Sequence, residues 1–248
     1  MIKKLITFLR FDPVIVFQKL RLTSESKLGG ILTRRRVNKI YINSGLNDLF
    51  EKYGKLDSNK KYALFMSDHK KADIVHLYTQ AKKVRTVLEF GCGVSTIAMA
   101  YALKQNGKGK VHVVEADQRW AELVEQAIVA LGLGEYCSIL YSPSRLVINN
   151  LEISSLFEHL PNIRPDLIYL DGPDPSSVEG DQHGLTMSGL YFIVSADPLL
   201  YEWSLYAGAK IIVDGRINNV RFLERNLRRK YSVSRNYIRN ITTFSLIR

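Results

Sequence analysis

One stretch, residues 86–99 (TVLEFGCGVSTIAM), constrains the fold of this chain more than any other. A short run of β-type residues leads into Gly91-Cys92-Gly93 and continues directly into a helix-forming segment, which predicts a strand, a tight turn and a helix. Glycines in such a turn let the backbone touch a ligand, and the unpaired amides that begin the helix attract polar or anionic groups. We therefore expect a ligand to bind at this turn.

Further strands follow at intervals long enough to hold helices. The expected strands cover residues 110–115, 137–141, 166–170 and 209–213, and a hairpin of residues 231–238 and 241–247 ends the sequence. Glu115 ends the second strand about twenty residues after the glycine turn, where nucleotide-binding α/β proteins place a carboxylate on ribose hydroxyls. This order predicts an α/β fold: a Rossmann-like, doubly wound sheet, mostly parallel, with a C-terminal antiparallel hairpin.

At these positions the sequence resembles the class I S-adenosylmethionine-dependent methyltransferases. VLEFGCG is similar to the first motif of that family, VVEAD to the second and DLIYLDGP to the fourth, and the resemblance extends over residues 84–247, about two thirds of the chain. A dinucleotide dehydrogenase would carry glycine at position 96, where this chain has Thr96. The resemblance implies an enzyme that takes S-adenosylmethionine as its cofactor.

The resemblance also implies a place for each part of the cofactor. The glycine turn would hold its amino-acid part, Glu115 its ribose, and the loop after the third strand its adenine, although that loop lacks the acid often found there in the family. Asp171, at the end of the fourth strand, would lie beside the methyl-transfer site. The implied cofactor-binding residues are Glu89, Gly91, Cys92, Gly93, Glu115, Ala116, Ser142 and Asp171.

Asp171 has three interpretations from the sequence: it orients the acceptor or acts as a base, it binds a divalent cation, or it caps a turn. The catechol-type O-methyltransferases, a related branch, bind a metal through an acid after strand four and an Asp-Asn pair after strand five. Here the second position reads Asp214-Gly215, so one ligand is missing unless Asn218 or Asn219 replaces it. We assign no metal ligand and leave a divalent cation as an open alternative.

A polar segment rich in turn-forming residues, 174–189, follows the fourth strand and is a candidate lid or acceptor loop. Histidine side chains ordinarily titrate close to neutral pH. The histidine in this segment, His183, is therefore a second candidate catalytic residue beside Asp171. The alternative is a surface histidine with no catalytic role.

The composition fits one α/β domain with an N-terminal appendage. The 248 residues are 46% hydrophobic, enough for a sizeable core, and we predict an appendage of residues 1–43 and a domain of residues 44–248. Cys92 and Cys137 form no CxxC pair, which indicates neither a disulfide framework nor a zinc site. The N-terminal apolar runs are too short for a signal-peptide core or a membrane span, so we expect a cytoplasmic protein.

The net charge of +11 is concentrated at the two ends of the sequence. Residues 1–40 hold ten Lys or Arg against two acids, residues 216–248 hold nine against one, and the residues between them are net −5. Residues 2–11 and 13–20 predict two basic amphipathic helices, which would lie on an anionic membrane surface or pack on the main domain or on a second subunit of a homodimer. Residues 22–43 are expected to form a polar link.

The acceptor is inferred from the residues just after the fourth strand. Nucleic-acid enzymes of this fold that methylate amines commonly carry an Asn/Asp-Pro-Pro-aromatic motif there, whereas this chain has DGPDP with no aromatic residue. We therefore hypothesise O-methylation of a small molecule, a sugar or a lipid-linked glycan. The alternatives are an RNA methyltransferase, which the basic ends favour, and a protein that binds the cofactor or a partner without turnover.

Overall fold

The computed structural model describes residues 27–56, 68–187, 194–236 and 241–248. The chain divides into two compact units, residues 1–47 and 48–248. The two amphipathic helices predicted within residues 2–20 lie outside the described residues. Among the helices of the described ranges, none is long and apolar enough to span a membrane.

The segment predicted as a polar link forms a helix instead. Helix α3 covers Lys27–Asn43, and α4 follows at Leu46–Leu56. Val37 and Tyr41 are both buried and lie four residues apart, so they share one face of α3. The high content of charged residues in this segment hid that short apolar face, so the sequence analysis assigned no helix there.

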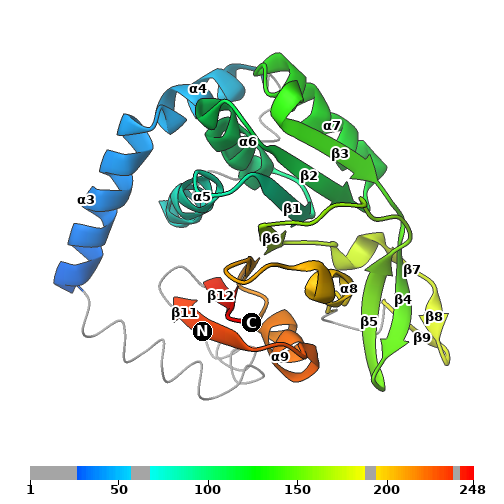
Figure 1. The fold of residues 1–248 in the computed structure, drawn as a ribbon. Helices are drawn as coiled ribbons and strands as arrows, with labels where there is room; N and C mark the ends of the chain where they lie inside the picture. Colours follow the sequence, from blue (N-terminus) through cyan, green and yellow to red (C-terminus); the bar gives the residue numbers. More distant parts are fainter. Residues whose placement is uncertain (1–26, 57–67, 188–193, 237–240) are drawn as a thin grey trace, which may run out of the picture. The chain divides into compact units, whose positions relative to one another are not determined.

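A seven-stranded sheet forms the centre of the unit that begins at residue 48 (Figure 1). Five neighbouring strands are parallel, and a C-terminal hairpin adds two more, with β12 antiparallel to β10. In spatial order the strands are β11 (Tyr231–Asn236), β12 (Ile241–Leu246), β10 (Lys210–Val213), β6 (Leu167–Leu170), β1 (Thr86–Phe90), β2 (Lys110–Glu115) and β3 (Cys137–Tyr141). This arrangement confirms the predicted Rossmann-like fold.

Helices cover both faces of the sheet (Figure 1). The helices on one face are α5 (Asp68–Ala81), α6 (Val94–Asn106) and α7 (Gln118–Ala130), and those on the other are α8 (Asp197–Tyr201) and α9 (Ile217–Asn226). Successive strand residues point to opposite faces, so Leu88 and Phe90 of β1 enter the core cluster that also contains Phe222 of α9. Both faces of the central strands are thus apolar and buried, as parallel strands require.

Asp166 fixes the register where β1 and β6 begin. Its carboxylate accepts hydrogen bonds from the backbone amides of Arg85 and Thr86, each at 2.9 Å. The predicted fourth strand, residues 166–170, begins one residue later in the structure, at Leu167. The opposite, carboxyl ends of β1 and β6 are brought level by this register.

A second sheet, which the sequence analysis did not anticipate, lies beside the main one (Figure 1). It consists of β5 (Glu152–Phe157), β4 (Ser144–Asn149) and β7 (Val178–Glu179), and a small hairpin follows from β8 (Asp181–Gln182) and β9 (Leu185–Thr186). The β4–β5 turn consists of Asn150 and Leu151, both with positive φ, at 49° and 65°. Two successive positive φ angles are typical of a type I′ hairpin turn, for which glycine is the usual second residue. Leucine at that position concealed the hairpin.

Short 3₁₀ helices complete the described elements. They are η2 (Gly134–Tyr136), η3 (Pro175–Ser177) and η4 (Glu202–Ser204).

The tip of the β4–β5 hairpin is tied to the end of α9, because Asn150 donates a hydrogen bond of 2.6 Å to the side-chain oxygen of Asn226. The second sheet is therefore anchored to the main domain at its far end.

Two glycines meet backbone to backbone where β1 and β6 end. A Cβ atom added to Gly172 would lie 2.7 Å from the Cα atom of Gly91, and one added to Gly91 would lie 2.9 Å from the backbone nitrogen of Gly172. Gly91 also has φ +85°, a conformation that other residues rarely adopt. Only glycine at both positions lets the two strand ends approach this closely.

We predict that Gly172→Ala destabilises the protein by about 1–3 kcal/mol, because the added methyl group must displace backbone rather than a flexible side chain. Thermal unfolding should shift downward by roughly 3–10 °C for a protein of this size. Gly93→Ala is the matched control, since a Cβ atom there meets nothing within 4 Å. Equal melting temperatures for the two variants would contradict the proposed steric role of Gly172.

Candidate active site

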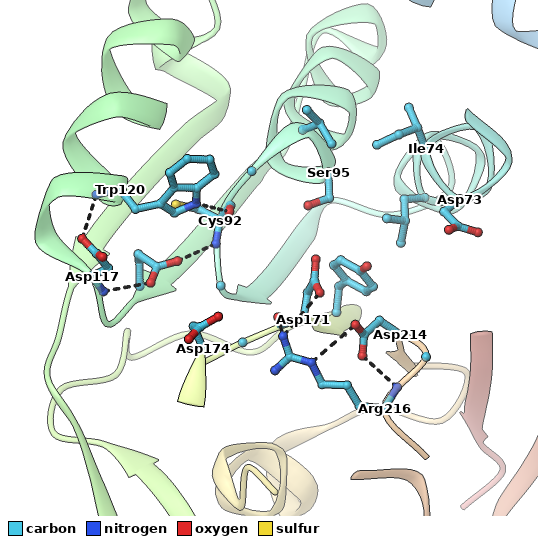
Figure 2. A pocket seen from close by; sticks show the side chains of 18 of the residues that line it. Asp73, Ile74, Cys92, Ser95, Asp117, Trp120, Asp171, Asp174, Asp214 and Arg216 are labelled. Carbon is cyan, nitrogen blue, oxygen red and sulfur yellow. Dashed lines mark hydrogen bonds and ion pairs between the residues drawn. The ribbon is translucent and has the colours of Figure 1, made fainter. Parts of the chain in front are cut away.

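A cavity of about 580 Å³ opens at the carboxyl ends of β1, β2, β6 and β10 (Figure 2). Open α/β sheets characteristically bind ligands at this edge. Helix α5 supplies one wall through Asp73, Ile74 and Leu77, and the glycine turn after β1 supplies another. All residues that line the cavity belong to the unit of residues 48–248.

Glu89 lies directly beneath the glycine turn, at the end of β1, and is fully buried. Its carboxylate accepts hydrogen bonds from the hydroxyls of Ser95 and Thr96 in the first turn of α6, at 2.5 and 2.6 Å. Burial raises its pKa to about 8, and the hydroxyl donors only partly oppose that shift. Glu89 does not line the cavity itself, but Ser95, which it holds, does.

Glu115 faces the cavity from the end of β2. One carboxylate oxygen accepts a hydrogen bond of 2.9 Å from the backbone amide of Cys92, and the other accepts from the amides of Ala116 and Asp117 at 2.7 and 2.9 Å. The side chain is 5% exposed and still lines the cavity. A carboxylate has about four lone-pair sites, so three backbone donors fix Glu115 and leave it able to accept from a ligand hydroxyl.

Trp120 is a site residue that the sequence analysis missed. Its indole nitrogen donates a hydrogen bond of 2.7 Å to the carbonyl of Cys92, and its backbone amide donates to the capping carboxylate of Asp117. The ring lines the cavity beside the glycine turn (Figure 2). An aromatic residue in the first turn of the helix that follows the β2 acid was a signal for this contact.

A second hollow of about 530 Å³ adjoins the cavity, and the two share Asp117, Ser176 and Ser177 as lining residues. Ala116 lines this second hollow rather than the first. The 3₁₀ helix η3 therefore forms a common border, and the segment after β6 that was predicted as a loop over the site does contribute Asp174, Ser176 and Ser177 to it.

Asp171, Asp214 and Arg216 form a cluster at the ends of β6 and β10 (Figure 2). The Nη2 atom of Arg216 lies 3.8 Å from Asp171 Oδ1, and its Nε atom lies 3.5 Å from Asp214 Oδ2. Burial, and next the charge of Asp171, raise the pKa of Asp214 well above its ordinary value. Both carboxylates are expected at these strand ends from the sequence, whereas Arg216, two residues after Asp214, is a site residue that only the structure identifies.

The cavity collects negative charge in a chain that is strongly basic overall. Arg216 is the one basic side chain among the described residues that line it. Six acidic side chains line it: Asp73, Glu115, Asp117, Asp171, Asp174 and Asp214. In a chain of net charge +11, this reversal favours a cationic ligand in the cavity.

Two residues proposed from the sequence lie elsewhere. Ser142 is fully buried, accepts a hydrogen bond of 2.8 Å from the backbone amide of His159, and lines neither hollow. His183 lies exposed in the turn between β8 and β9, with φ 53°, and lines neither hollow. The β4–β5 hairpin, which the sequence analysis missed, explains both: it follows directly after Ser142, and β7 to β9 pair beside it.

The structure thus brings together most of the residues inferred from the sequence motifs. Gly91, Cys92, Gly93, Glu115 and Asp171 all line the main cavity. Cys92 and Cys137 both carry free thiols. Burial raises the pKa of each thiol, so neither is poised as a thiolate nucleophile.

Comparison with known proteins agrees with this geometry. Residues 88–185 match the family model described as a methyltransferase domain, and no curated protein sequence matches the chain. An S-adenosylhomocysteine-bound methyltransferase of Podospora anserina is 14% identical, with 86% of this chain and 96% of that chain covered and a TM-score of 0.52. A candidate caffeoyl-CoA O-methyltransferase of Staphylococcus aureus is also 14% identical, with 88% and 100% covered and a TM-score of 0.51. At this identity the two structures show a shared fold.

We predict that Glu89→Gln flattens the pH dependence of stability. Because the folded pKa of Glu89 is raised from 4.5 to about 8, the folded chain holds a proton that the unfolded chain has lost across this interval. Wild-type stability should therefore fall as pH rises from 5 to 8, with a contribution on the order of 3 kcal/mol from this group. Urea unfolding at both pH values measures the difference.

The matched control is Glu125→Gln, which removes an exposed carboxylate from α7. This control should keep the wild-type slope of stability against pH. If Glu89→Gln keeps that slope as well, a protonated Glu89 is not part of the folded protein near neutral pH.

Proposed function

We propose that this chain, whose residues 88–185 match the model of a methyltransferase domain, uses S-adenosylmethionine to methylate a hydroxyl group of a small acceptor. The observation that carries the proposal is the acidic cavity built around the glycine turn. S-adenosylmethionine is a sulfonium cation, and six carboxylates against one arginine favour a cation there. The same carboxylates would repel the negatively charged phosphates of a dinucleotide.

The residues at the cavity fit the parts of this cofactor. The close approach of Gly91 to Gly172 leaves bare backbone where the amino-acid part would lie, and Ser95 faces the same space. Glu115, held by three amides, is a ready acceptor for ribose hydroxyls. Trp120 offers a flat ring beside them, on the side where the second hollow begins at Asp117. We infer that the adenine lies toward that hollow rather than at Ser142.

The cofactor supplies a methyl group bound to a positively charged sulfur. The protein must hold the acceptor oxygen in line with that methyl group and take the proton the hydroxyl loses as the new oxygen–carbon bond forms and the sulfur–carbon bond breaks. Asp171 is the side chain that we place in this role. Its carboxylate is 42% exposed within the cavity and is oriented by Arg216. His183, which lines neither hollow, is the weaker of the two candidates.

The charge of the cavity also bears on the acceptor. A phosphate group beside Asp171, Asp174 and Asp214 would be repelled, so the part of the acceptor that enters the cavity is neutral or cationic. A hydroxyl of a sugar or of another small molecule meets this requirement, whereas an RNA backbone meets it poorly. The candidate caffeoyl-CoA O-methyltransferase of similar fold also favours an oxygen acceptor.

Binding to an anionic membrane surface, assembly into a homodimer and a cytoplasmic location stay predictions from the sequence.

We predict that the purified protein binds S-adenosylmethionine and that Glu115→Gln weakens this binding at least ten-fold, about 1.4 kcal/mol. The amide cannot accept from all of the backbone donors that fix Glu115 and also accept from the ribose. Calorimetric titration measures both affinities, with NAD as the ligand that should not bind. Glu125→Gln, which changes an exposed carboxylate of α7 that lines neither hollow, is the matched control.

The same titration can overturn the proposal. No binding of S-adenosylmethionine to a protein that is folded by circular dichroism would remove its basis. Binding of NAD with similar affinity would point to a general nucleotide site instead.

We predict that Asp171→Asn lowers methyl transfer at least 100-fold while S-adenosylmethionine affinity falls less than ten-fold, because the amide cannot take a proton but five other carboxylates still line the cavity. Transfer is measured with a methyl-labelled cofactor and a panel of sugar and small-molecule hydroxyl acceptors. His183→Asn is the comparison, and it should retain wild-type transfer. Loss of activity in His183→Asn alone would reverse the assignment. Firm cofactor binding with no transfer to any hydroxyl acceptor or to RNA would favour a binding protein without turnover.

A further inference from the structure

We propose that the guanidinium of Arg216 takes the place of a divalent metal ion between Asp171 and Asp214. It holds the two carboxylates together, so the acceptor side of the cavity works without a metal. This inference deepens the proposed function and rests on it only for the identity of the acceptor side. The placement of Arg216 between the two carboxylates is visible in the protein alone (Figure 2).

The two carboxylates resemble the beginning of a metal site. Asp171 and Asp214 follow neighbouring parallel strands, and both line the cavity. Hard divalent cations bind several oxygen ligands, so a third and a fourth donor would be needed beside these two. Within the described ranges, no group of three or more His, Cys, Asp or Glu side chains is arranged to hold a metal ion.

The asparagines that follow β10 do not complete the set. Asn219 is 1% exposed, and its side-chain oxygen accepts a hydrogen bond of 2.9 Å from the backbone amide of Ser195, which holds it away from the cavity. Asn218 is not among the residues that line the cavity. Besides Arg216, these strand ends therefore offer a divalent cation only the two carboxylates, with water as its remaining donors. The alternative that Asn218 or Asn219 supplies the missing ligand has no support here.

Arg216 occupies the space between the strand ends instead. Its Nη1 atom donates a hydrogen bond of 2.9 Å to the carbonyl of Pro173, and its Nη2 atom donates to the carbonyl of Asp171. The same guanidinium forms ion pairs with Asp171 and Asp214, and the backbone amide of Arg216 donates to Asp214 at 3.2 Å. Arg216 thus contacts the residues that follow both β6 and β10.

A guanidinium at this place has two consequences. It keeps its positive charge at all relevant pH values, so it neutralises part of the charge of the two carboxylates permanently. It also repels a second cation that would use the same oxygens. Arg216 is therefore a positioning residue: it sets the orientation of Asp171 and prevents a metal ion from doing so.

The test measures Mn²⁺ binding to the full chain without cofactor or acceptor, by calorimetry and by the electron paramagnetic resonance signal of free Mn²⁺. We expect no saturable site in the wild-type protein. Arg216→Ala, which exposes both carboxylates, should gain one saturable Mn²⁺ site, at least ten-fold tighter than any weak binding seen with the wild type. Adding Asp171→Asn to Arg216→Ala should remove the gained site. Arg228→Ala, an arginine outside the cavity, controls for the loss of one positive charge.

Two results would overturn the proposal. One is a wild-type protein that binds one Mn²⁺ as tightly as Arg216→Ala and loses it with Asp171→Asn, since the arginine would then not exclude the metal. The other is a folded Arg216→Ala that gains no Mn²⁺ binding. If Arg216→Ala does not fold, Arg216→Gln carries the same test with less loss of packing. Binding of S-adenosylmethionine is titrated separately in the same preparations, so a failure of the proposed function is distinguished from a failure of this inference.

Discussion

The contact between Gly91 and Gly172 is the constraint on which the site depends. It brings the turn after β1 against the segment after β6 at backbone distance, so the groups inferred to hold the cofactor and those inferred to face the acceptor share one wall of the cavity. Asp166 sets the same two strands in register at their opposite ends. With both ends of β1 and β6 fixed, the side chains at their carboxyl edge have little freedom to separate.

The acidic groups of the site are held by fixed donors of three different kinds. Hydroxyls from α6 hold Glu89, backbone amides hold Glu115, and a guanidinium holds the pair Asp171 and Asp214. Buried or half-buried carboxylates are costly unless they are hydrogen-bonded or paired, so these donors make a concentration of acids possible inside a folded domain. For the proposed cationic cofactor, carboxylates that are already held in place reduce the reorganisation that binding requires.

The β4–β5 hairpin shows how an added element redirects a sequence-based interpretation. The family resemblance placed Ser142 near the adenine, and the polar segment after the fourth strand made His183 a candidate base. The hairpin instead begins two residues after Ser142, and the following strands β7 to β9 place His183 in an exposed turn beside it. The asparagine and leucine of its turn adopt the positive φ angles that a two-residue hairpin needs, without the glycine that would have revealed it.

Local sequence patterns were enough to establish the order and type of the central elements and the residues at the glycine turn, because alternation, apolar runs and glycine spacing are local properties of the chain. They set the bounds of β1, β2 and β3 and placed Glu115 and Asp171 at the cavity edge. Only the tertiary structure brought in the wall from α5 and Arg216 between two carboxylates from different strands. Contacts of that kind depend on how distant segments pack, and no local pattern specifies them.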